Sequence, residues 1–142
     1  MRITSQEHLD SLSESSIRRI KKLNCAGTNV VNIPTSLVNL TDLNVSRCPY
    51  IVNIPFLSNL ESLWCSDCPM LEYIPELPHV KTANFYMSKL KKLPHLSEIK
   101  ILYCHSCPNL TCVSDYPNLE ELYYSYPISI TNCNKLSSIK II

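Results

Sequence analysis

From residue 23 onward the sequence repeats a pattern of apolar residues with a period of about 20 residues. Successive repeats begin at equal steps, except that the step from Ala83 to Leu102 is shorter by one residue. A single repeat cannot bury its own apolar edge, whereas stacked repeats can, so the pattern predicts a solenoid of coils. A seventh coil is predicted to begin at Ile142. The other coils are predicted to begin at Leu23, Leu43, Leu63, Ala83, Leu102 and Leu122.

Within each coil, apolar residues are first two residues apart and then three residues apart. The first and third positions are apolar, which indicates a short strand with one buried face. The ninth, twelfth, fifteenth and eighteenth positions are three residues apart, a spacing that suits a polyproline II or 3₁₀ return segment. In the last coil, Ile130, Cys133 and Ile139 are assigned to the ninth, twelfth and eighteenth positions. The predicted fold is a curved solenoid with a parallel β-sheet on its concave side and these return segments on its convex side.

The best-preserved coil carries a known signature. Residues 60–71 read Leu-Glu-Ser-Leu-Trp-Cys-Ser-Asp-Cys-Pro-Met-Leu, which resembles the leucine-rich repeat superfamily. The repeat length and the Ile-Pro-x-Leu-Pro back half resemble the short bacterial-effector subclass, and the Cys-Pro-x-Leu element resembles repeat proteins of large amoeba-infecting DNA viruses. The resemblance implies a leucine-rich repeat solenoid that acts as a protein-interaction module.

Two C-x-x-C pairs, Cys65/Cys68 and Cys104/Cys107, raise the hypothesis of a zinc site. Sulfurs around one zinc ion lie roughly 3.8 Å apart, whereas the two pairs are separated by two coils, or about 9.6 Å, so they do not share an ion. Cys65 is predicted to face the core, and Cys68, Cys107 and Cys48 are predicted to satisfy backbone groups at the sixth position. A metal-binding or redox role for Cys48, Cys65 and Cys68 is the alternative function, although no metal ligand is assigned.

The two ends of the array differ. Residues 1–22 fit the repeat poorly and are predicted to form a helical cap, with a capping box over Thr4–Glu7 and one or two short helices over about residues 5–20. Residues 23–142 are predicted to form the repeat array. No cap is predicted after the last coil. Either this coil is distorted enough to close itself, or the chain is a fragment of a longer protein, or its edge pairs with another chain, and the fragment and self-association are favoured over closure.

Candidate binding residues lie at the second, fourth and fifth positions, which point out of the concave sheet. From the third coil onward these positions are rich in aromatic residues, and exposed aromatic clusters are typical of interface hot spots. An alternative is that the rings only strengthen the sheet by stacking across strands. The predicted partner-binding residues are Trp64, Tyr86, Tyr103, His105, Tyr123, Tyr126, Arg47 and Asp67.

Composition excludes several classes of function. Gly27 is the only glycine, so no glycine-rich phosphate loop is present, and a net charge of +1 gives no electrostatic reason to bind nucleic acid or membranes. The sequence shows no secretory signal and no apolar run long enough to span a bilayer. We therefore expect a non-catalytic, cofactor-free protein of the cytoplasm (of a host cell if the chain is viral) that binds a protein partner. The substrate-recognition part of a ubiquitin-ligase adaptor is a further alternative.

Overall fold

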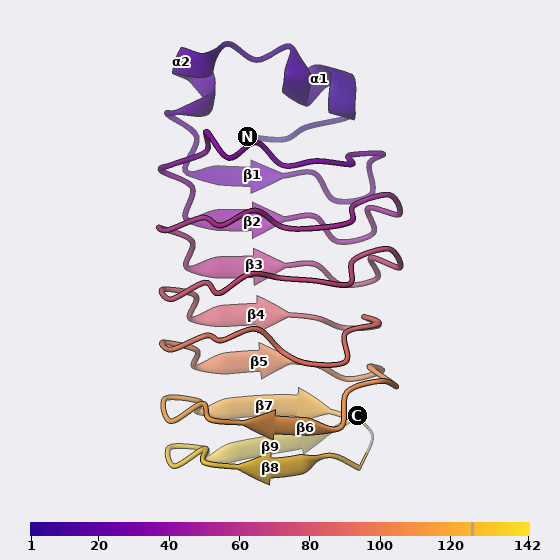
Figure 1. The fold of residues 1–142 in the computed structure, drawn as a ribbon, viewed down its shortest axis with the longest axis vertical. Helices are drawn as coiled ribbons and strands as arrows, with labels where there is room; N and C mark the ends of the chain where they lie inside the picture. Colours follow the sequence, from indigo (N-terminus) through magenta and orange to yellow (C-terminus); the bar gives the residue numbers. More distant parts are fainter. Residues whose placement is uncertain (126) are drawn as a thin grey trace.

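The computed structural model describes residues 1–125 and 127–142, in which the chain winds through stacked coils (Figure 1). Within these residues, each coil adds one parallel strand to a seven-stranded sheet of order β1-β2-β3-β4-β5-β7-β9. Two further strands, β6 (Cys112–Ser114) and β8 (Ser129–Thr131), pair on the opposite side of the coils, here called the return side. The strands of the large sheet are β1 (Lys22–Asn24), β2 (Asp42–Asn44), β3 (Ser62–Trp64), β4 (Thr82–Asn84), β5 (Ile101–Tyr103), β7 (Glu121–Tyr124) and β9 (Ser138–Ile141).

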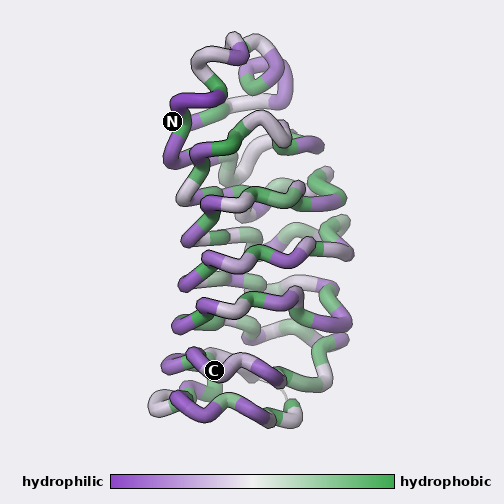
Figure 2. Tube along the Cα trace, turned by 60° about the vertical axis from the view of Figure 1, so that its left-hand side comes forward, coloured by the Kyte–Doolittle hydropathy of each residue, from purple (hydrophilic) through white to green (hydrophobic). Residues whose placement is uncertain are grey.

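The pairing register confirms the predicted stacking of the coils. The middle residue of each of the strands β1 to β5 is buried between more exposed neighbours, as the period of two requires. Third-position residues such as Val45 and Phe85 are also buried, and Figure 2 shows hydrophobic residues recurring in every coil. The residues that lie opposite one another across successive strands are Leu23, Leu43, Leu63, Ala83, Leu102 and Leu122.

A left-handed bend follows each of the first five strands, at the fifth position. This conformation costs a non-glycine residue about 1–2 kcal/mol, so contacts elsewhere must maintain it. Backbone hydrogen bonds to the next coil do so: the Arg47 N–H donates to the Ser66 carbonyl at 2.9 Å, and the Asp67 N–H donates to the Tyr86 carbonyl at 2.8 Å. The φ values are 73° at Gly27, 59° at Arg47, 53° at Asp67, 55° at Met87 and 56° at Ser106.

The return segments contain turns of the predicted 3₁₀ type. The N–H of the eighteenth position donates to the carbonyl three residues earlier, as from Leu60 to Leu57 at 3.1 Å and from Ile99 to Leu96 at 3.2 Å. Both positions are buried. The spacing between the fifteenth and eighteenth positions therefore corresponds to a turn. Among the described residues of the second coil, no such bond joins Ile54 to Ile51 or Leu57 to Ile54.

Two short helices, α1 (Gln6–Asp10) and α2 (Glu14–Ile17), lie over the first coil (Figure 1). The predicted capping box begins one residue too early, because Ser5 rather than Thr4 is the N-cap of α1. Among the described residues, neither helix is long and apolar enough to cross a membrane. The boundary of a separate cap domain at residue 22 stays a prediction.

The last coil is shorter than the preceding ones, because Ile139 pairs opposite Leu122. The prediction of a seventh strand at Ile142 is therefore wrong. The assignments of Ile130 and Cys133 are also wrong by one turn, since Ile130 pairs with Val113, the twelfth position of the preceding coil. Ile139 and Ile141 are 52% and 72% exposed on β9, and self-association through this end stays a prediction.

Candidate functional site

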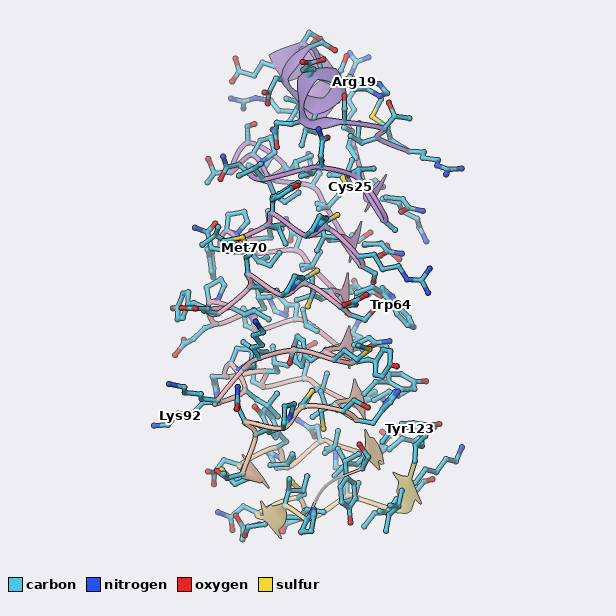
Figure 3. All side chains as sticks on the ribbon, turned by 90° about the vertical axis from the view of Figure 1, so that its right-hand side faces the viewer. Arg19, Cys25, Trp64, Met70, Lys92 and Tyr123 are labelled. Carbon is cyan, nitrogen blue, oxygen red and sulfur yellow. The ribbon has the colours of Figure 1, made fainter. Side chains whose placement is uncertain are left out.

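Three aromatic rings form a column on the outward face of the large sheet. Tyr103 and Tyr123 stack with ring centroids 4.3 Å apart, and the centroids of Trp64 and Tyr103 are 6.1 Å apart. The second of these contacts spans two coils, because the intervening strand carries the smaller Asn84 at the same position. Lys140 continues the column from β9, with its Nζ 4.8 Å from the centroid of the Tyr123 ring. Trp64 and Tyr123 project from the same side of the molecule in Figure 3.

A second, shorter column lies at the fourth position. Tyr86 and His105 stack with ring centroids 4.3 Å apart. Partial burial lowers the pKa of His105 through desolvation, so the ring is neutral at pH 7. A neutral imidazole stacks on a tyrosine ring without bringing a charge to the face.

Polar contacts fix the edges of the rings. The Trp64 Nε1–H donates to the Ser62 hydroxyl at 2.9 Å, and the Tyr123 hydroxyl donates to the Glu121 carboxylate at 2.9 Å. The Lys140 ammonium donates to the Tyr123 oxygen at 3.0 Å. Glu121 and Lys140 were not among the predicted site residues, and Lys140 was missed because the length of the last coil was misjudged.

Asparagines at the second position have a structural role. The side-chain oxygens of Asn24, Asn44 and Asn84 each accept a hydrogen bond from the backbone N–H two residues later, at 2.9–3.0 Å. They hold the bend after the strand. In coils with an aromatic residue at this position, that residue extends from the sheet instead.

Not all predicted site residues join the rings. Arg47 and Asp67 lie at the left-handed bends, with Arg47 exposed and Asp67 partly buried, and neither belongs to a ring column. Tyr126 lies outside the described residues. The columns therefore comprise Trp64, Tyr86, Tyr103, His105 and Tyr123, which together are called the aromatic face.

A hollow of about 230 Å³ adjoins the aromatic face at Trp64. Asn24 and Asn44 line it from β1 and β2, together with Asp42 and Lys22. It has room for a side chain of moderate size beside the indole, with polar groups around it.

The sixth-position cysteines satisfy backbone carbonyls of the preceding coil, as predicted. The thiols of Cys48, Cys68 and Cys107 donate to the carbonyls of Cys25, Val45 and Phe85 at 3.0–3.1 Å. Ser88 occupies the same position in the fourth coil, and its hydroxyl lies 3.3 Å from the Cys107 sulfur. Each of these cysteines therefore contributes to the stacking of coils through a hydrogen bond to a backbone carbonyl.

Burial makes several thiols poor nucleophiles and poor metal ligands. Desolvation raises the pKa of Cys25 and Cys104 to about 12 and of Cys68 to about 11, and the pKa of Cys65 is well above its ordinary value. Among the described residues, no group of three potential ligands is arranged to hold a metal ion. The metal or redox alternative gains no support from this placement.

Replacing Cys68 tests its hydrogen bond. Cys68→Ala should lower the free energy of unfolding by about 1–2 kcal/mol, because it removes a buried donor and leaves a small void. Cys68→Ser should lose less, since Ser88 fills the equivalent position in the fourth coil. Urea denaturation of both variants measures the difference, and equal losses would contradict the role of the hydrogen bond.

Comparison with known protein families agrees with this geometry. A family model described as "Plant disease resistance protein RPS2-like, leucine-rich repeats" matches residues 5–142. Comparisons with curated proteins and with solved structures gave no significant match. Leucine-rich repeat arrays are typically protein-interaction modules and usually non-catalytic. With nearly its whole length matched and its coils stacked in register, the chain belongs to the RPS2-like leucine-rich repeat family.

Proposed function

We propose that the protein is a non-catalytic interaction module that binds a protein partner through the aromatic face. The observation that supports this most directly is the column of Trp64, Tyr103 and Tyr123, which projects from the sheet and remains partly exposed. The leucine-rich repeat fold does not require aromatic residues there, since Asn24, Asn44 and Asn84 occupy the same position in other coils.

The ring columns are suited to binding because they are already ordered. Stacking and the hydrogen bonds from Trp64 and Tyr123 restrict the side chains before a partner arrives. A pre-ordered ring loses little conformational entropy on binding, whereas ordering a mobile side chain costs about 0.5–1.5 kcal/mol. The adjacent hollow beside Trp64 offers a place for an anchoring side chain of the partner.

The competing explanation is that the rings act only in sheet stability. Stacked aromatic pairs contribute about 0.5–1.5 kcal/mol beyond the area they bury. The two functions differ in what is lost on mutation: a supporting role predicts a loss of stability alone, whereas a binding role predicts a far larger loss of affinity.

The double variant Trp64→Ala/Tyr103→Ala separates these explanations. We expect it to lower affinity for the partner at least about 100-fold, as hot-spot residues do, and the free energy of unfolding by only about 1–3 kcal/mol. A photoreactive amino acid at Ser66, an outward fourth-position residue of the third coil, would first capture and identify the partner. Calorimetry then measures affinity, and the emission of Trp64, the only tryptophan, reports whether the partner covers this face.

The matched control is Tyr50→Ala/Phe56→Ala, which removes two aromatic residues that are 55% and 59% exposed outside the large sheet. Its affinity should stay within about twofold of the wild type. An unchanged affinity in the Trp64/Tyr103 variant, with a clear loss of stability, would assign the rings to the sheet alone.

The subclass and location are finer proposals. The short, regular steps and the Cys-Pro-x-Leu elements support the short-repeat subclass described above, and with it a host-cell protein as the partner. The free cysteines, six of them buried, support a reducing compartment such as the cytoplasm.

A further inference from the structure

One missing residue changes the fourth coil. Its turn reads Ser88-Lys89-Leu90, whereas the third coil has the four residues Cys68-Pro-Met-Leu71. In the third coil the Leu71 N–H donates to the Cys68 carbonyl at 3.1 Å, and the described residues contain no equivalent bond in the fourth coil. The chain therefore enters the return side of this coil along a different path.

Backbone pairing on the return side is absent at this coil. Tyr73 forms a bridge with Asn53 of the preceding coil, and β6 pairs with β8 of the following one. Residues 91–93 lie between Tyr73 and β6, at the position where a continuous ladder of backbone pairs would include them. Among the described residues, no bridge and no backbone hydrogen bond joins 91–93 to either neighbour.

Clefts open on both sides of this segment. One of about 590 Å³ separates it from the third coil, and one of about 290 Å³ separates it from the fifth. The larger cleft lies between Tyr73 and residues 91–93, so backbone groups of two unpaired edges border it. Such edges accept an added strand.

The larger cleft is apolar with a basic rim. Ile74, Leu93 and Pro94 line it, and the exposed lysines Lys89, Lys91 and Lys92 surround it. Glu72 is the one carboxylate among the described lining residues. Lys92 projects from the return side in Figure 3, away from Trp64 and Tyr123.

We propose that this cleft binds an acidic peptide segment of a partner protein in an extended conformation. Extended backbone pairs with the unpaired edges, alternate carboxylates lie against the lysines, and the apolar side chains between them contact Ile74 and Leu93. The lysines favour this occupant over a small anion, because they are exposed and spread along the cleft rather than buried around one point. The surface is distinct from the aromatic face, so it does not depend on the function proposed above.

A capped, fluorescein-labelled eight-residue peptide of alternating glutamate and leucine is the probe, since an extended chain places the two residue types on opposite faces. Fluorescence anisotropy should show binding to the wild type that weakens as salt concentration rises. Replacing the glutamates with lysines, or N-methylating the leucines, should reduce affinity at least about tenfold, because these changes remove charge pairing and backbone pairing respectively.

Variants of the protein test the cleft itself. Lys91→Glu/Lys92→Glu should reduce affinity at least about tenfold. Arg19→Glu/Lys21→Glu makes the same change of net charge at exposed residues near α2 and should stay within about twofold. Inserting proline between Ser88 and Lys89 restores the four-residue turn and should also abolish binding without altering charge.

Other occupants are distinguished in the same assay. Failure of the peptide to bind, with capture of inorganic phosphate or of phosphatidylserine vesicles through Lys91 and Lys92, would overturn the proposal. Equal binding of the N-methylated peptide would overturn the extended pairing. If the insertion variant fails to fold, the charge-reversal pair and the N-methylated peptide still decide the outcome.

Discussion

Raising the pH from 8 to 10 should lower the free energy of unfolding by roughly 5 kcal/mol, a large part of the stability of a domain this size. The cause is the burial of Cys25, Cys65, Cys68 and Cys104. Desolvation raises the pKa of Cys25 and Cys104 to about 12 and that of Cys68 to about 11, and it raises the pKa of Cys65 well above its ordinary value. Below pH 9 these thiols are protonated in both states. Above pH 9 the unfolded chain releases protons that the folded protein retains, so unfolding gains about 1.4 kcal/mol per thiol by pH 10.

Urea denaturation at pH 7, 8, 9 and 10, with a reducing agent present, measures this dependence. Cys25→Val/Cys104→Val is the matched variant, because Val45 fills the same third position in the second coil. Its loss of stability between pH 8 and 10 should be about 3 kcal/mol smaller than that of the wild type. Stability that stays constant to pH 10 in the wild type would show that these thiols ionise freely in the folded protein.

The fold was predictable because the first position repeats at a nearly constant distance. Parallel pairing of Leu43 with Leu63 requires only that each coil bring the chain back to the sheet one strand further along the solenoid axis. The regular 20-residue step does so. The one-residue deletion in the fourth coil did not disturb that prediction. The cleft beside residues 91–93, on the return side of that coil, depends on backbone pairing that the apolar pattern does not encode.

The last coil was misassigned for a physical reason. Its apolar residues Ile130, Cys133, Leu136 and Ile139 are three apart, so shifting them by three gives an equally regular pattern. The apolar pattern therefore does not reveal that the last coil is three residues shorter. Pairing of Ile130 with Val113 and of Ile139 with Leu122 selects the shorter coil.

The candidate site was only partly predictable. Alternation along each strand predicted that Trp64, Tyr103 and Tyr123 point outward together. Contact between Trp64 and Tyr103 across two coils depends on the small size of Asn84 and on ring orientations, which the spacing does not specify. Lys140 joins the column only because the last coil is short.

Phe85→Ala should be the most damaging single truncation in the core, lowering the free energy of unfolding by about 3–5 kcal/mol. Phe85 is fully buried and, within residues 1–125 and 127–142, has the largest of the completely buried side chains. Phe56, the only other phenylalanine, is 59% exposed, so Phe56→Ala should change stability by no more than about 0.5 kcal/mol. Urea denaturation of both variants makes the comparison within one chain, and similar losses would contradict the placement of Phe85.

The fourth coil accommodates Phe85 because the residue two positions earlier, Ala83, is small. Ala83 replaces the leucine found at the first position of the other coils, and both side chains point into the same core. Ala83→Leu alone should overpack the coil and cost about 1–3 kcal/mol, and Phe85→Val alone should leave a void that costs about 2 kcal/mol. The double variant conserves total volume, so its loss should be smaller than the sum of the single losses by at least about 1 kcal/mol. Additive losses would show that the two positions do not share the space between the third and fifth coils.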